Sequence, residues 1–366
     1  MSQAKPQKAL PKVLPKVLPR VLVAMSGGVD SSVAAAMLCD EGYEVAGVTL
    51  KLWGGPSDSG CCSVSDVDDA RWVADRLGIE HHVFNFGDDF EQHVVDPYVK
   101  DHASGRTPNP CVECNRHIKF DRLMRRAEAL GFDLVATGHH ARIVDTPAGP
   151  RLARGADFGK DQSYVLHMIS AELLKRLLLP VGDITKDEVR QIAAERGLMT
   201  AAKPDSQDVC FIKSDTGRRS FLGERIPLRP AKIVDRSGEQ VGTTDAVELV
   251  TIGQRRGLGV LSTHEPRYVV EIDAENSTVI VGDQSELQVA ETQVTQWQWS
   301  ADTCSDEVQV QTAAHGPVFP AVINDDDHGT ADAQVIRWLK PHRAVAAGQS
   351  VVAYKDDVVI GGGVAA

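Results

Sequence analysis

The chain has 366 residues, of which 42% are hydrophobic and 25% are charged, and its formal net charge is −12 at pH 7. This composition is ordinary for soluble proteins, and no apolar run is long enough to cross a bilayer, so we expect no membrane association. The negative balance argues against a surface generally coated with nucleic acid, although a local basic strip could still bind RNA.

Residues 10–21 read LPKV-LPKV-LPRV, with proline at every fourth position. Proline removes helix donors and favours extended chain, and the segment lacks the continuous apolar region of a signal peptide. We therefore predict a mobile tail over 1–19. Seven cysteines, an odd number, indicate a reducing compartment and favour a cytoplasmic protein.

From residue 21 onward the sequence alternates between strand and helix patterns. Strands are predicted at 21–25, 44–52, 81–86 and 133–137, with helices at 32–39, 66–77, 88–100 and 116–130. Such alternation is typical of an α/β fold with a doubly wound parallel sheet, in which ligands bind beyond the carboxyl ends of the strands. We place this domain at 20–145, with an extension to about residue 165.

The second half of the chain has a different texture. Segments 163–178 and 185–197 look helical, and Thr185 and Glu188 form a capping-box pattern at the start of the second. They predict a small central helical domain at 166–225. Short β-rich runs, 248–252 among them, then alternate with turn residues and favour a barrel or paired barrels over 226–366.

The strongest motif is SGGVDSS at 26–32, between the first strand and the first helix. Its glycines allow the backbone to approach a phosphate closely, and the helix N-terminus offers unpaired N–H groups. The motif lacks the Gly-Lys-Ser/Thr of loops that support γ-phosphoryl transfer. It resembles the PP-loop of the N-type ATP pyrophosphatases, in which a substrate oxygen attacks the α-phosphate of ATP.

Two cysteine-containing segments distinguish among the enzymes that carry this loop. Cys114 lies just before a helix rich in basic residues, where a thiol gains thiolate character, and Cys210 lies in a polar segment where a thiol can be reached. Cys39 falls on the apolar side of the first helix and is expected in the core. These two thiols, Cys114 and Cys210, are the candidate nucleophiles.

Several segments then occur in one order along the chain. They are SGGVDSS (26–32), GRTPNPCVECN (105–115), ATGHHAR (136–142), KDQSYVL (160–166), DSQDVCFI (205–212), TIGQRRGLG (251–259), AGQ (347–349) and GGG (361–363). The ordered set resembles the tRNA-specific 2-thiouridylases over essentially the whole chain after the tail. The resemblance implies an ATP pyrophosphatase domain, a central helical tRNA-binding domain and a C-terminal β-barrel.

The resemblance also implies a reaction. ATP, with Mg²⁺, adenylates O2 of the wobble uridine of tRNA, and sulfur then displaces AMP at C2. Cys210 would receive persulfide sulfur from a donor such as a cysteine desulfurase or a relay protein. Cys114 would release that sulfur and close a Cys114–Cys210 disulfide.

The matching motifs imply further site residues. The implied ATP contacts are Ala24, Met25, Ser26, Gly27, Gly28, Val29, Asp30, Ser31, Leu50 and Gly138. The implied tRNA contacts are Asn109, Pro110, Cys111, His139, Lys160, Asp161, Gln162 and Gln349.

Position 111 departs from the family pattern, because many members have Asp where this chain has Cys111. Cys111, Cys114 and Cys210 could instead hold an iron–sulfur cluster with one iron open to sulfide, which would deliver sulfur without a persulfide. A second alternative is a PP-loop thiolase that acts on another RNA position.

Overall fold

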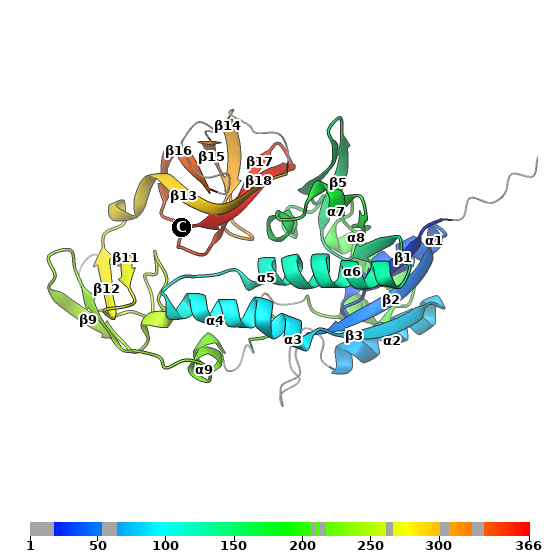
Figure 1. Cartoon of the computed structure of the whole chain (residues 1–366), viewed down its shortest axis with the longest axis horizontal. Helices are drawn as coiled ribbons and strands as arrows, with labels where there is room; N and C mark the ends of the chain where they lie inside the picture. The colour runs from blue at the N-terminus through cyan, green and yellow to red at the C-terminus, as the bar shows by residue number, and fades with distance from the viewer. Residues whose placement is uncertain are drawn as a thin grey trace, which may run out of the picture.

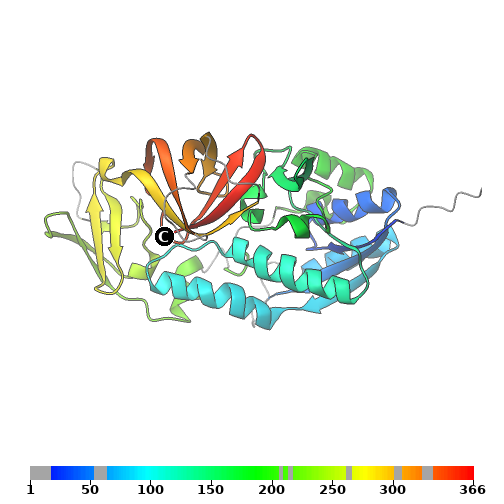
Figure 2. The same cartoon turned by 45° about the horizontal axis from the view of Figure 1, so that its top comes forward.

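The computed structural model describes residues 18–52, 64–205, 209–212, 217–260, 266–300, 307–323 and 333–366. The predicted mobile tail lies outside the described residues except for its last two positions. No helix within the described ranges combines the length and apolarity that crossing a membrane requires. Figures 1 and 2 show an elongated molecule with the parallel sheet at one end and two β units toward the other.

The first unit is a parallel sheet, as predicted. Its strand order is β3 (Glu80–Asn85), β2 (Glu44–Lys51), β1 (Arg20–Ala24), β4 (Leu134–Thr137) and β7 (Leu177–Leu178). Side chains of the central strand β1 alternate between two cores, because successive residues of a strand point to opposite faces.

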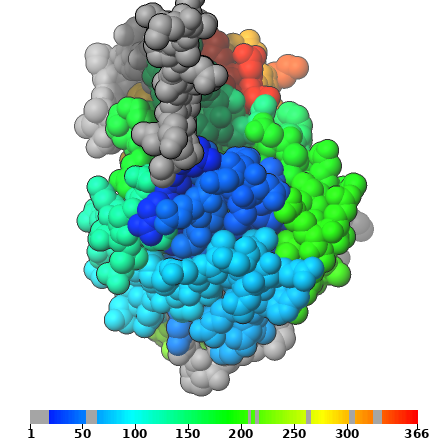
Figure 3. All heavy atoms as spheres, turned by 90° about the vertical axis from the view of Figure 1, so that its right-hand side faces the viewer, coloured from blue at the N-terminus to red at the C-terminus, as the bar shows by residue number. Residues whose placement is uncertain are grey.

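One face of this sheet packs against three helices, α1 (Val29–Asp40), α2 (Val64–Leu77) and α8 (Lys186–Glu195). Val21 and Val23 of β1 point toward them, and Val33 and Val189 are buried in the same core. Figure 3 views this end of the molecule, with α1 in blue beside α2 in light blue and the α8 segment in green.

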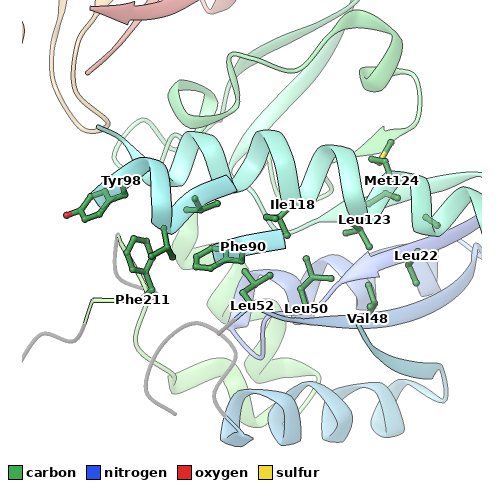
Figure 4. Packing of buried hydrophobic residues seen from close by; sticks show 14 of the residues in the cluster. Leu22, Val48, Leu50, Leu52, Phe90, Tyr98, Ile118, Leu123, Met124 and Phe211 are labelled. Carbon is green, nitrogen blue, oxygen red and sulfur yellow. The ribbon is translucent and has the colours of Figure 1, made fainter. Parts of the chain in front are cut away.

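Two long helical runs cover the opposite face. The first consists of α3 (Gly87–Phe90), η1 (Glu91–Val95) and α4 (Asp96–Ala103), and the second of α5 (Pro110–Glu113), η2 (Cys114–Arg122) and α6 (Leu123–Ala129). Figure 4 shows Phe90 and Ile118 of these runs packed over Leu50 of β2. The segment 105–109 connects the two runs.

The expected helix over 163–178 is wrong. The chain there forms η3 (Ser163–Leu166), α7 (Ala171–Leu174) and then β7, which pairs in parallel with β4. The Ser170 side chain accepts a hydrogen bond from the Leu173 amide and caps the start of α7, so α7 is a helix separate from η3. The predicted small helical domain therefore does not form a layer of its own. Strand β7 completes the parallel sheet, and α8 packs on α1. The remaining helices of this part, η4 (Met199–Ala202) and α9 (Gly217–Gly223), are short.

The capping box at α8 is confirmed. The Thr185 side chain accepts from the Glu188 amide, and the Glu188 carboxylate accepts from the Thr185 amide. This places the start of the helix at Lys186.

The middle unit is a mixed sheet, whereas the sequence predicts that this part belongs to the barrel region. Its order is β10 (Gly259–Val260), β9 (Gln240–Thr244), β8 (Ala231–Val234), β12 (Thr278–Gly282) and β11 (Tyr268–Asp273). The expected strand at 248–252 is wrong, because η5 (Val247–Leu249) occupies its start. Glu248 is buried there, and its carboxylate accepts hydrogen bonds from the amide and the side chain of Arg229. A short η6 (Ser285–Leu287) leads into the last unit.

The last unit is the predicted β-barrel. Six strands close on themselves in the order β13 (Gln288–Trp299), β16 (Ala333–Arg343), β15 (Val318–Ile323), β14 (Glu307–Gln311), β17 (Ser350–Lys355) and β18 (Val358–Ala365), with β13 also pairing β18. A hairpin that the sequence did not reveal, β5 (Ala141–Thr146) and β6 (Gly149–Arg154), extends this sheet from β18. The hairpin links the barrel to the strand end at which the PP-loop lies.

Candidate active site

A cavity of about 310 Å³ lies at the carboxyl ends of the parallel strands, where a doubly wound sheet is expected to bind ligands. This volume is within the range of small-molecule sites. The PP-loop, the start of the second helical run and the segment around Cys210 meet there. Of the predicted ATP contacts, those that line the cavity are Ala24, Met25, Ser26, Asp30, Ser31, Leu50 and Gly138.

Gly27 and Gly28 shape the turn from β1 into α1. Gly27 has φ +74°, and a Cβ there would lie 2.3 Å from the Asp66 carbonyl oxygen, so only glycine fits. Gly28 is the N-cap of this twelve-residue helix and has no side-chain cap, which leaves helix amides able to bind an anion. The other three predicted ATP contacts, Gly27, Gly28 and Val29, do not line the cavity.

Gly138, at the end of β4, packs directly against the start of α1. A Cβ on Gly138 would lie 2.5 Å from the Ser31 backbone nitrogen, so any side chain would push the two elements apart. The Ser31 hydroxyl accepts from the Ser26 amide at 3.2 Å and donates to the Gly28 carbonyl at 3.2 Å. The loop is therefore held in shape by its own hydrogen bonds and by the strand beside it.

Asp30 carries a negative charge into a loop that would bind phosphate, and two neighbours compensate it. Lys186 Nζ donates to both Asp30 oxygens at 2.7 Å, and His140 Nε2 lies 3.0 Å from Oδ1. Burial alone would raise the pKa of Asp30, but the hydrogen bonds from His140 and Lys186 outweigh it and lower the pKa. Asp30 is therefore a carboxylate held in a partly buried ion pair.

Asp205 belongs to the same network and leads to Cys210. Its carboxylate pairs with Lys160 at 2.8 Å, Arg190 at 2.6 Å and Lys186 at 3.1 Å. Burial would raise the pKa of Asp205, but hydrogen bonds from Lys160 and Lys186 hold it well below its usual range. Lys186 thus bridges the PP-loop and the segment that carries Cys210.

The sequence reasoning missed three lysines at this site. Lys186 reaches in from the first residue of α8, Lys119 lines the cavity from the second helical run, and Lys203 donates to the Gly27 carbonyl at 3.0 Å. Lys203 could have been found, because it lies only two residues before the DSQDVCFI motif at 205–212. The other two come from elements whose direction depends on tertiary packing.

His139 is a buried histidine in the cavity wall. Its Nδ1 lies 2.7 Å from Thr137 Oγ1 and its Nε2 lies 3.3 Å from Lys119 Nζ. Because an ammonium can only donate, Nε2 is the acceptor and Nδ1–H donates to Thr137. Burial and then the Lys119 charge lower the pKa of His139 well below its usual value, so the ring is neutral.

The cavity brings the predicted nucleophiles together. Cys111 and Cys114, on the helical run that begins at Pro110, line it together with Cys210. Asn109 caps this run, since its side-chain oxygen accepts from the Cys111 amide at 3.1 Å. Phe211 packs its ring against Phe90, with centroids 5.6 Å apart, and this contact fixes the segment of Cys210 beside the helices.

The remaining predicted tRNA contacts divide into two groups. Pro110, His139, Lys160 and Gln162 line the cavity, and the Gln162 side chain accepts from the His140 amide. Asp161 is buried and accepts from Arg154, from the Gly155 amide and from Ser163. Gln349 donates to the Thr107 carbonyl at 2.6 Å and joins the barrel to the 105–109 segment.

The described part of the chain contains no group of three or more His, Cys, Asp or Glu side chains arranged to hold a metal ion. Cys111, Cys114 and Cys210 share the cavity wall without forming such a group.

Three family models match consecutive parts of the chain. They are described as the tRNA methyl transferase HUP domain (19–214), the tRNA methyl transferase PRC-barrel domain (219–283) and the aminomethyltransferase beta-barrel domain (289–365). Their limits agree with the parallel sheet, the mixed sheet and the closed barrel of the structure.

The chain is also similar to curated proteins over most of its length. It is 48% identical to "tRNA-specific 2-thiouridylase MnmA" of Sorangium cellulosum over 351 residues, which cover 93% of this chain and 90% of that protein. It is 44% identical to the protein of the same name from Herpetosiphon aurantiacus over 360 residues, with 93% and 96% covered. The crystal structure of a 4-thiouridine synthetase–RNA complex with bound ATP has a TM-score of 0.36 at 19% identity, covering 52% of this chain and 44% of that one.

Proposed function

The chain belongs to the tRNA-specific 2-thiouridylase family, and we propose that it uses ATP to replace the C2 oxygen of the wobble uridine of tRNA with sulfur. The observation that carries the proposal is one cavity that contains both the PP-loop and the thiols of Cys114 and Cys210. A phosphate-binding loop beside thiols suits sulfur transfer to an adenylated base. We further propose that the reaction takes place in the cytoplasm.

The first step activates the uracil. Its O2 attacks the α-phosphate of ATP, pyrophosphate leaves, and the C2 oxygen becomes part of a phosphate ester, so AMP can later depart where oxide could not. The amides at the start of α1 and the Ser26 hydroxyl are suited to bind the phosphates. Met25 and Leu50 supply an apolar wall for the adenine, and Gly138 keeps the loop close to the sheet.

The second step delivers sulfur. A donor, either a cysteine desulfurase or a relay protein, loads Cys210 as a persulfide. Cys114 attacks the Cys210 sulfur, forming a Cys114–Cys210 disulfide and releasing hydrosulfide, which adds to C2 and expels AMP. The shared cavity wall supports this assignment of the two thiols.

The tRNA contacts follow the family motifs. Pro110 and Cys111 line the cavity and are proposed to meet the target base, and Asn109 holds them there by capping their helical run. A neutral His139 is suited to hydrogen-bond an uncharged base. Lys160 and Gln162 lie at the cavity and offer a cation and an amide to the RNA backbone.

Asp161 and Gln349 complete the proposed contact set through the loops that they hold. Asp161 fixes the loop that presents Lys160 and Gln162, whereas Gln349 fixes the segment that leads to Pro110. Each of these side chains already has an intramolecular partner, so the loops themselves are proposed to meet the tRNA.

Mg²⁺ is assigned to the nucleotide. The Asp30 oxygens contact Lys186 and His140, so the ligands of the ion would be phosphate oxygens and water, as is common for Mg²⁺ in ATP sites. Such an ion would supply positive charge to offset the charge of the pyrophosphate as it leaves. The alternative, in which Cys111, Cys114 and Cys210 hold an iron–sulfur cluster that delivers sulfur, predicts iron in the anaerobically purified protein, and the persulfide relay predicts none.

Nucleoside mass spectrometry tests the proposal. An unmodified tRNA with a wobble uridine is incubated anaerobically with the protein, ATP–Mg²⁺ and a persulfide donor. 2-Thiouridine should form with one pyrophosphate per sulfur, and both Cys114→Ser and Cys210→Ser should lose it. Free sulfide should restore both variants, because hydrosulfide then adds to C2 without the relay.

Cys39→Ser is the matched control, since Cys39 lies on α1 outside the cavity wall. It should thiolate tRNA at the wild-type rate. ATP binding without any thiolated nucleoside from the wild-type protein would refute the proposal and direct the search to another adenylated acceptor.

A further inference from the structure

Cys111 is a cavity thiol that the proposed relay leaves unused. Cys111 and Cys114 lie three residues apart on backbone that is helical from Pro110 through Cys114, where φ is −60° and ψ −46°. In an α-helix, Cα atoms at this spacing are about 5 Å apart. Disulfides span Cα separations of roughly 4.4–6.8 Å. The pair can therefore form a disulfide without moving the main chain.

Cys114 is also the thiol that the relay joins to Cys210. Cys210 lines the same cavity, and Phe211 beside it packs against Tyr98 and Phe221, with ring centroids 5.5 Å and 5.1 Å away. Cys114 thus has two possible disulfide partners, Cys111 on its own helical run and Cys210 in the same cavity wall. Thiol–disulfide exchange can replace one partner of Cys114 with the other.

We propose that Cys111 is the resolving cysteine of the relay, an inference that rests on the proposed function. The Cys111 thiolate attacks the Cys114 sulfur of the Cys114–Cys210 disulfide. A Cys111–Cys114 bond forms, the Cys114–Cys210 bond breaks, and Cys210 leaves as a thiolate that takes the proton Cys111 gave up. One disulfide replaces another, so the step needs no oxidant or reductant.

The exchange separates reloading of Cys210 from reduction. Cys210 is regenerated and can accept the next persulfide, while the oxidising equivalents stay on the Cys111–Cys114 pair. An external dithiol then reduces the Cys111–Cys114 disulfide through a second exchange and regenerates the Cys114 thiol. The reductant meets a disulfide within one helical turn instead of one that ties two segments together across the substrate cavity.

Peptide mapping after oxidation tests the exchange without tRNA. Trypsin places Cys111 and Cys114 in one peptide, 107–116, and Cys210 in another, 197–213. After limited diamide oxidation, the wild type should give peptide 107–116 with an internal disulfide. Cys111→Ser should instead give 107–116 cross-linked to 197–213, and Cys39→Ser should match the wild type.

The thiolation assay supplies the second readout. With a dithiol as the reductant, the wild type should form many 2-thiouridines per protein molecule, whereas Cys111→Ser should form no more than one. A wild-type protein that accumulates only the cross-link, or that holds iron on the three thiols after anaerobic purification, would overturn the proposal. Failure of the wild type to thiolate tRNA at all would refute the proposed function, and the peptide map would still decide the exchange.

Discussion

Replacing Lys186 by methionine tests how charge is balanced at the phosphate site. Lys186 Nζ lies 2.7 Å from both Asp30 oxygens, and its side chain is 8% exposed. Two unit charges about 4 Å apart interact by about 4 kcal/mol at an effective dielectric constant of 20. Asp30 is 29% exposed, so screening by water reduces this to about 2 kcal/mol. Without Lys186, ATP phosphates would meet an Asp30 carboxylate compensated by His140 alone among the described residues, and the Kd for ATP should rise about thirtyfold.

Isothermal titration of ATP–Mg²⁺ into the protein measures the effect. Lys186→Arg keeps the charge and should stay close to the wild type. Lys175→Met removes the same charge from an exposed ion pair with Glu172 and should leave the Kd unchanged. If Lys186→Met bound ATP within twofold of the wild type and melted at the same temperature, the reasoning on Asp30 would be refuted.

Three other substitutions or titrations test separate parts of the structure. Gly138→Ala should lose ATP binding in the same titration through about 3 kcal/mol of overpacking, whereas Gly223→Ala, whose Cβ would lie 3.5 Å from its nearest neighbour, should keep it. Asp205→Asn should lower the thermal midpoint by a constant amount from about pH 5 to 8; since the folded-state pKa of Asp205 is below the unfolded one, its stabilisation is lost only as pH falls through the folded pKa, and a difference confined to alkaline pH would contradict this. Burial lowers the pKa of His102 and His167 to about 4, so the unfolded chain binds protons that the folded chain does not. The free energy of unfolding should therefore fall between about pH 6 and 5 by up to about 1.4 kcal/mol per histidine, and ring NMR signals that titrated near pH 6.5 in the folded protein would show the assignment to be wrong.

The sequence predicted those features whose physics is local. The SGGVDSS turn and the Thr185 capping box depend on residues within one helical turn, and both take the expected form. Strand β7 was missed because Leu177 and Leu178 continue an apolar pattern that also fits a helix. Their strand conformation is set by pairing with β4, a contact between residues about forty positions apart that no local pattern records.

The residues of the site also fall into those that the sequence predicts and those that it does not. The ordered motifs predicted the PP-loop and the thiols, which share one cavity. The motifs could not show that the side chains of Asp161 and Gln349 form hydrogen bonds within the protein. Their partners, Arg154 and Thr107, come close to them only after the chain folds. Nor could the motifs reveal Lys186, whose importance comes from its position between two carboxylates.

That position couples the two halves of the reaction. Asp205 keeps Lys160 and Arg190 as partners if Lys186 turns toward an incoming phosphate, so Asp205 stays in place. Asp30 has no such reserve beyond His140 among the described residues. ATP binding would then leave the sulfur side of the cavity in place while changing the charge at the PP-loop. It follows that Asp205→Asn should slow sulfur transfer through Cys210 and have little effect on the Kd for ATP. Lys186→Met should instead raise the Kd for ATP and have little effect on sulfur transfer.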